Sequence, residues 1–285
     1  MTTLQLFTIL GIFFLAALRP FVFYPCAKRF SPRTSCAFSA IWSVIGALLI
    51  LPFFHHKLII NEVYFYNDLL AIGLGVLKGI LLWFMIKHIQ VVKKESNSCS
   101  VYFGFISIAI GACANYFLFN SLLTTTQIIG IILIGIMGLL FFIFGQAKKL
   151  SKEGKISFWL LVFILAAIIM TDHNAVSHTN WYVQFTVTGA TMLIFSIVSG
   201  TSIKEWKNAI FDRDSVLAGI VYAAGGICLM SAMITILPVS MVSLIIRLAA
   251  PAVMVISAFM YKEGKWYEQA AFGGLTMAAA LPLIF

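Results

Sequence analysis

The stretch NDLLAIGLGVLKGILLWFMIKHIQ, residues 67–90, is mainly apolar and carries one lysine, Lys78, near its middle. A helix needs about 20 such residues to cross the roughly 30 Å hydrocarbon core of a bilayer. A lysine near the bilayer centre costs about 2.5–3.5 kcal/mol, whereas each leucine or isoleucine returns about 0.3–0.6 kcal/mol. The stretch therefore predicts a transmembrane helix whose buried amine needs an acid, backbone carbonyls or water around it.

The whole chain has the composition of a helical membrane protein. Of its 285 residues, 61% are hydrophobic and 10% are charged, whereas soluble domains keep about a quarter of their residues charged. Long apolar runs favour helices over a barrel, whose strands would alternate. The net charge of +9 thus indicates topology and not a nucleic-acid partner. The five cysteines are scattered singly, so neither a metal motif nor a redox motif is indicated.

Ten apolar segments of about 20 residues predict an all-α integral membrane protein with ten transmembrane helices. The expected spans are residues 4–24, 35–54, 67–88, 97–119, 125–145, 156–176, 182–200, 215–235, 238–260 and 267–284.

The basic residues between these spans are distributed very unevenly. Fifteen lie around the ends of the odd-numbered spans or after them, and Lys57 alone lies on the other side. Basic loops stay in the cytoplasm, so an even number of spans places both termini outside. We expect a multi-pass protein of the bacterial cytoplasmic (inner) membrane.

Two pairs of segments suggest an internal repeat. Residues 67–90 align with residues 214–237, and TTTQIIGIILIGIMGLL (124–140) aligns with YEQAAFGGLTMAAALPL (267–283). This divides the chain into two units of five spans, residues 1–147 and 148–285. An odd number of spans inverts the second unit relative to the first, as in many secondary transporters. The alternative explanation for these alignments is that apolar segments generally resemble one another, without any repeat.

The segment ITILPVSMVSLIIRLAAPAVMVISAFMYKEGKWYEQAAFGG (234–274) resembles EamA-type members of the drug/metabolite transporter (DMT) superfamily. The resemblance rests on a helix with a central Pro251, on KEG with Glu263, and on Gln269 with a glycine pair opening the last helix. It is good over 215–285, fair over 100–145 and poor over spans 1, 2, 6 and 7. YFLFNSLL lacks the acid that many members have there.

The resemblance implies two inverted EamA-like repeats, metabolite transport by alternating access, and a cavity lined chiefly by spans 1, 3, 4, 6, 8 and 9. Several members of the family are drawn with cytoplasmic termini. The distribution of basic residues predicts the opposite orientation for this chain.

Four charged residues lie well inside predicted spans, away from the span ends: Arg19, Lys78, Asp172 and Arg247. With a rise of 1.5 Å per residue, Lys78 and Arg247 lie about 16 and 13 Å from the outer surface, close to the midplane. We expect Lys78 and Arg247, with Arg19, to bind the anionic group of a substrate in a water-filled cavity. Small and hydroxylic helix faces add Ser107, Ser231 and Ser243 to the substrate-binding residues, although helix packing also explains such faces.

Several alternatives remain open for these residues. A structural ion pair would join Asp172 to Arg19 or Lys78. Asp172 and His173 could instead form a protonatable outer gate that couples transport to protons. A metal site at His173 and His178 is disfavoured by their spacing, and no catalytic motif indicates an enzyme.

The sequence thus predicts a secondary active transporter for a small anionic or zwitterionic metabolite: amino-acid-like, phosphorylated or nucleoside-derived. One alternative is a proton-coupled exporter of cationic or amphipathic compounds that uses Asp172. An alternative of another class is a non-transporting membrane subunit. We expect a small-molecule substrate and the lipid bilayer as partners, no nucleic acid, no cofactor and no metal. We expect a monomer, with a homodimer as the alternative.

Overall fold

The computed structural model describes residues 3–54, 65–119, 122–178, 181–200, 203–235 and 239–284. Across these ranges the chain is helical, with short connections and no strand. The α-helices are α1 (Thr3–Arg29), α2 (Pro32–Phe54), α3 (Phe65–Glu95), α4 (Cys99–Phe119), α5 (Thr125–Ile143), α6 (Lys152–His178), α7 (Trp181–Val198), α8 (Ile203–Phe211), α9 (Arg213–Thr235), α10 (Val239–Tyr261) and α11 (Trp266–Ile284).

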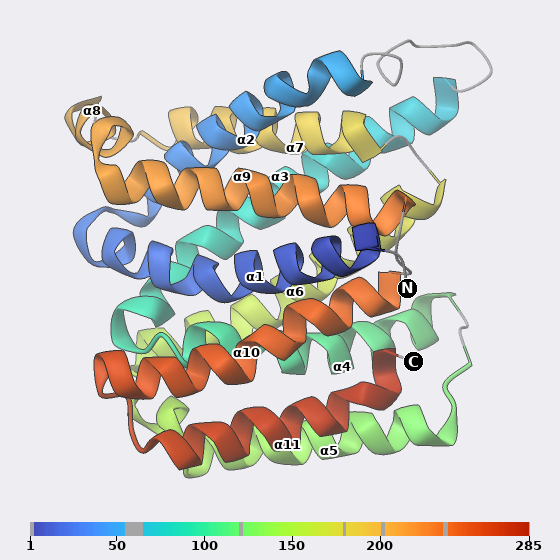
Figure 1. Ribbon diagram of the computed structural model, residues 1–285, viewed down its shortest axis with the longest axis vertical. Helices are drawn as coiled ribbons and strands as arrows, with labels where there is room; N and C mark the ends of the chain where they lie inside the picture. Colours follow the sequence, from blue (N-terminus) through green and yellow to red (C-terminus); the bar gives the residue numbers. More distant parts are fainter. Residues whose placement is uncertain are drawn as a thin grey trace.

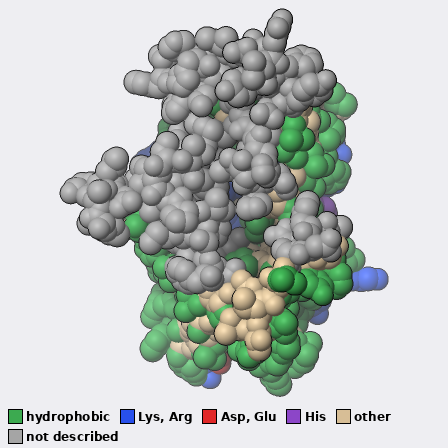
Figure 2. Space-filling view, turned by 90° about the vertical axis from the view of Figure 1, so that its right-hand side faces the viewer, with side chains coloured by type: hydrophobic (Ala, Val, Ile, Leu, Met, Phe, Trp, Pro, Cys, Tyr) green, Lys and Arg blue, Asp and Glu red, His purple; other side chains and the backbone are tan. Residues whose placement is uncertain are grey.

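Each of the ten predicted segments lies in one of the long helices. Four stretches are long and apolar enough to cross a membrane on their own: Ile9–Arg29, Leu69–Glu95, Thr125–Ile143 and Lys152–Asp172. Their outer faces carry large apolar side chains, among them Phe14 at 65% exposure, Leu139 at 62% and Phe163 at 57%. Hydrophobic side chains also cover most of the described surface visible in Figure 2. The protein is therefore an integral membrane protein.

The helices run roughly parallel to one another, so that their ends gather at two opposite ends of the molecule (Figure 1). One end holds α8 and the connections α1–α2, α3–α4, α5–α6 and α10–α11. The connections and the helix ends next to them carry the clustered basic residues of the sequence, and we call this the basic end. The start of α1 and the end of α11 both lie at the opposite end.

The predicted spans leave residues 201–214 as a basic loop, whereas the structure contains the short helix α8 there. Ile203, Trp206 and Ile210 recur at helical spacing, with Lys204 and Lys207 between them. This amphipathic pattern is typical of a helix lying along an interface. The Glu205 carboxylate ties α8 to the α1–α2 connection, because it accepts a hydrogen bond from the Ser31 backbone N–H at 2.7 Å.

Helices α3 and α7 approach closely at two glycines of α3. A Cβ atom at Gly75 would lie 2.9 Å from the Gln184 carbonyl oxygen, and one at Gly79 would lie 2.6 Å from Thr191 Cβ. Small residues permit such backbone approach in membrane helices. The GxxxG spacing of Gly75 and Gly79 thus serves helix packing here.

The basic end is held together by a carboxylate that caps a helix. Glu263, in the α10–α11 connection, accepts hydrogen bonds from the backbone N–H groups of Asn97 at 2.6 Å and Ser98 at 2.8 Å. The Ser96 hydroxyl donates a third, at 3.0 Å. These groups open α4, where a negative charge satisfies free N–H groups and opposes the helix dipole. The contact fixes α4 against α10, and both helices border the cavity described next.

Candidate functional site

A cavity of about 410 Å³ lies between the helices. Its lining comes from α1, α3, α4, α6, α9 and α10, with further residues of α2 and α7. The first six correspond to the spans that the family resemblance implies. Most of the lining side chains are apolar, so the few charged and polar groups among them determine what the cavity can bind.

One face of α3 supplies a long strip of this lining. Lys78, Leu82, Met85, Ile89 and Lys93 all border the cavity, and their separations of three and four residues place them on one side of a helix. The fifteen residues from Lys78 to Lys93 correspond to about 22 Å along the helix axis. Because α3 ends at the basic end, Lys93 lies nearer that end than Lys78.

Lys78 forms an ion pair with Asp172 of α6, in which its amine donates to Asp172 Oδ1. The two side chains are 9% and 14% exposed. The alternative of an internal ion pair between Lys78 and Asp172 is thus confirmed, and Arg19 is not Asp172's partner. A carboxylate is what a largely buried amine needs in order to keep its charge.

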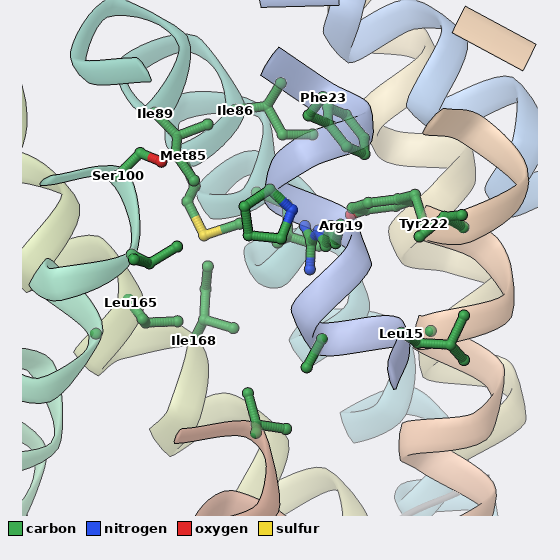
Figure 3. Close-up of a pocket in the computed structure, with 18 of the residues that line it drawn as sticks. Leu15, Arg19, Phe23, Met85, Ile86, Ile89, Ser100, Leu165, Ile168 and Tyr222 are labelled. Carbon is green, nitrogen blue, oxygen red and sulfur yellow. The ribbon is translucent and has the colours of Figure 1, made fainter. Parts of the chain in front are cut away.

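Arg19 of α1 projects toward the cavity and lies beside Tyr222 of α9 (Figure 3). Its guanidinium carbon is 4.7 Å from the centroid of the Tyr222 ring and 5.9 Å from that of Phe23. Aromatic faces attract a cation, more strongly where water is scarce. Among the residues that the structure describes, Arg19 forms no ion pair with a carboxylate.

Lys93 is a charged group of the cavity that the sequence did not predict, because its position suggested a basic loop residue. It is only 3% exposed, and its amine donates to the Pro20 carbonyl oxygen at 3.1 Å. The amine also lies 5.7 Å from the Phe23 ring centroid. The helical spacing from Lys78 was the signal that could have identified it.

The remaining predicted site residues divide into two groups. Ser107 is buried and lies outside the cavity lining, and its hydroxyl donates to the Phe103 carbonyl oxygen one turn earlier in α4 at 2.9 Å. Such a bond satisfies a hydroxyl within its own helix. The side chains of His173, Ser231, Ser243 and Arg247 lie outside the part that the structure describes.

Two neighbours of Arg247, Ile246 and Ala249, line the cavity, so this stretch of α10 borders it. Serines also reach the lining from two other helices, through Ser43 of α2 and Ser100 of α4. Of the three serines predicted to bind substrate, Ser107 alone has a described side chain, and it lies outside this lining.

Gln90 of α3 is the most unusual polar residue of the lining. It is 1% exposed, and neither its amide nitrogen nor its amide oxygen has a hydrogen-bond partner among the described residues. A buried amide without partners costs stability, and such groups often mark sites that bind water or a ligand. Within the described ranges, no group of three His, Cys, Asp or Glu side chains is arranged to hold a metal.

Comparisons with known proteins add no identification, since no family model and no curated protein matches the chain.

Proposed function

We propose that the protein is a secondary active transporter that moves a small anionic or zwitterionic metabolite across the cytoplasmic membrane by alternating access. The observation that carries this proposal is the charge of the cavity. Its described lining contains three cations, Arg19, Lys78 and Lys93, and one carboxylate, Asp172. An enclosed site with surplus positive charge favours an anionic ligand, because a low-dielectric wall strengthens each interaction.

The packing of the helices supports the inverted five-helix repeats that this mechanism uses. α3 packs against α6 and α7, and correspondingly α9 packs against α1 and α2. Likewise α4 packs on α6, as α10 packs on α1. If α1, α2, α3, α4 and α5 correspond in this order to α6, α7, α9, α10 and α11, each of these contacts in one half has its counterpart in the other half. We propose that these ten helices all cross the membrane in a DMT-like, EamA-type arrangement, with α8 as an added surface helix.

The rival proposal of a cation exporter depends on Asp172 as the acid that receives the substrate. That carboxylate is already paired with Lys78, so a cationic substrate would have to displace a buried amine. A non-transporting subunit would have no need of a cavity with several charged groups, which are costly to bury.

The test is a thermal-shift screen of the purified protein with metabolites grouped by charge, followed by counterflow in proteoliposomes. A ligand at a hundred times its Kd stabilises the folded state by about 2.7 kcal/mol. We expect anionic or zwitterionic metabolites to raise the melting temperature and then to exchange across the vesicle membrane. Stabilisation by cations alone, or binding without any counterflow, would contradict the proposal.

A further inference from the structure

We propose that Arg19, Lys93 and Gln90 form the subsite that holds the substrate's anionic group, and that Lys78 does not. We call these three residues the inner anion subsite. The inference rests on the proposed transport function and adds to it the location of the anion and the chemistry that recognises it.

Ion pairing distinguishes Lys78 from the other two cations of the cavity. Lys78 is neutralised by Asp172, which leaves Arg19 and Lys93 as cavity cations without a carboxylate partner among the described residues. Both lie against the ring of Phe23, so their like charges repel one another. Glu263 forms no ion pair with Lys93 among the described residues, and its oxygens already accept hydrogen bonds from Ser96, Asn97 and Ser98. An anion between the two cations would remove their repulsion.

The contacts of Arg19 and Lys93 leave hydrogen-bond donors open to a ligand. Both cations lie against the ring of Phe23, at 5.9 Å for Arg19 and 5.7 Å for Lys93. Ring contacts hold a charge without using its N–H donors. Lys93 uses one donor on the Pro20 carbonyl, and an ammonium group has three. The guanidinium group of Arg19 forms no hydrogen bond among the described residues, so its planar set of donors is open to a ligand.

Gln90 adds a neutral donor. It lies three residues before Lys93 on the same face of α3 and also lines the cavity. Its buried amide has no partner in the described structure, and an anion would accept from its NH₂ group. Together the three residues present a planar fork, a point charge and a neutral donor. This set fits a group with two or three anionic oxygens, which is a carboxylate or a phosphate.

Gln90→Leu is the decisive variant, because it separates binding from folding. Replacing a buried amide that has no partner with an apolar side chain of similar size should leave the melting temperature unchanged or raise it. If Gln90 instead donates to the anion, the same change should weaken binding several-fold. A purely structural role for Gln90 predicts neither the unchanged stability nor the lost affinity.

The experiment titrates the purified protein, in neutral detergent without added lipid, with inorganic phosphate and separately with acetate. We expect one of the two probes to bind, which distinguishes a phosphate from a carboxylate. Arg19→Gln and Lys93→Gln should each weaken that probe roughly ten- to a hundredfold. Lys78→Met/Asp172→Asn should bind it as the wild type does, and the exposed Lys152→Gln serves as the control.

The inference is overturned if neither probe binds the wild type, or if the double variant loses binding while Gln90→Leu retains it. Should the Arg19 and Lys93 variants not fold, Gln90→Leu still decides. Because this assay needs no transport, anion binding without counterflow would contradict the proposed function and leave the inner anion subsite intact.

Discussion

A single residue, Lys78, shows how a membrane helix accommodates an amine in its apolar interior. The carboxylate of Asp172 satisfies it directly, and both side chains are largely withdrawn from water. Removing one partner of such a pair leaves the other charge buried without a counter-ion, whereas removing both charges does not. This contrast gives the pair a distinctive mutational signature.

We therefore expect Lys78→Met and Asp172→Asn each to destabilise the protein by about 3–5 kcal/mol, and the double variant to recover most of that loss. Thermal unfolding in detergent, followed by tryptophan fluorescence, measures the three variants. The exposed Lys152→Met should change little. Single variants that are as stable as the wild type would show that the pair contributes nothing to the fold.

At this scale the sequence predicted part of the site and missed part of it. Arg19, Lys78 and Asp172 were identified because a charge inside an apolar run is conspicuous. Lys93 was missed because it lies near Lys94 and Glu95, in what looks like a solvated helix end. Lys93 contacts Pro20 and Phe23 of α1, and this packing cannot be read from α3 alone. The helical spacing from Lys78 was the one signal in the sequence that placed Lys93 on the same face.

Among the elements, α3 contributes both to helix packing and to the candidate site. One of its faces lines the cavity, and another contacts α7 at Gly75 and Gly79. A methyl group at Gly79 would lie 2.6 Å from Thr191 Cβ and 2.9 Å from the Thr188 carbonyl oxygen. The Thr188 backbone cannot move away from an added methyl group as easily as a flexible side chain can. By contrast, a Cβ at Gly73 would have no neighbour within 4 Å.

Gly79→Ala should therefore lower the stability by about 1–3 kcal/mol, as overpacking does. Gly73→Ala, on the same helix, should leave it unchanged or raise it by up to about 1 kcal/mol, because alanine loses less backbone entropy. Thermal unfolding of the pair provides the comparison. Equal effects at both positions would mean that α3 and α7 do not approach at Gly79.

The surface helix α8 offers a pH-dependent contact. Partial burial alone would raise the pKa of Glu205, but hydrogen bonds from Ser31 and Thr34, with Lys94 nearby, outweigh this and hold the pKa below its ordinary value of 4.5. A carboxylate with a depressed pKa stabilises the fold above its ordinary pKa, and that contribution is lost as the pH falls through the folded-state value.

Glu205→Gln should therefore be less stable than the wild type at neutral pH, and the difference should shrink as the pH is lowered below 4.5. Melting temperatures of both proteins across this range test the prediction. Glu268→Gln, whose carboxylate is 44% exposed and 3.9 Å from Lys265, is the matched control. A difference that stays constant with pH would exclude an ionised Glu205 as the anchor of α8.

The boundaries of the ten long helices were largely predictable, because each apolar run is about as long as one membrane span. α8 was not, since its nine residues are too few to span a bilayer and its lysines were counted as loop charge. The helix contacts could not be read from single segments either. Apolar residues cover both the buried and the outward faces of these helices, so hydrophobicity does not distinguish them.

For the molecule as a whole, the contacts of the charged residues follow the proposed repeat. Asp172 on α6 meets Lys78 on α3, and Arg19 on α1 meets Tyr222 on α9. If α6 corresponds to α1 and α3 to α9, the same pair of helices meets in each half, although the alignment of residues 67–90 with 214–237 places Lys78 opposite Gly225, one turn from Tyr222. One half uses a neutral ring where the other uses an opposite charge, so Arg19 has no carboxylate partner among the described residues.

The orientation of the molecule follows from the same arrangement. The basic connections lie at one end, and the start of α1 and the end of α11 lie at the other (Figure 1). Because basic loops remain in the cytoplasm, we predict that both termini are extracytoplasmic. Thr126, exposed at the start of α5, should then face outward, and Lys149, exposed in the α5–α6 connection, should face the cytoplasm.

In a background without other cysteines, Thr126→Cys should react with a membrane-impermeant thiol reagent in intact cells, whereas Lys149→Cys should react only after the cells are opened. A C-terminal fusion to an export-dependent reporter should be active, and a fusion to a fluorescent protein that matures only in the cytoplasm should be dark. The reverse pattern in both assays would invert the protein in the membrane. The inner anion subsite would then lie nearer the outside, because Lys93 belongs to the basic end of α3.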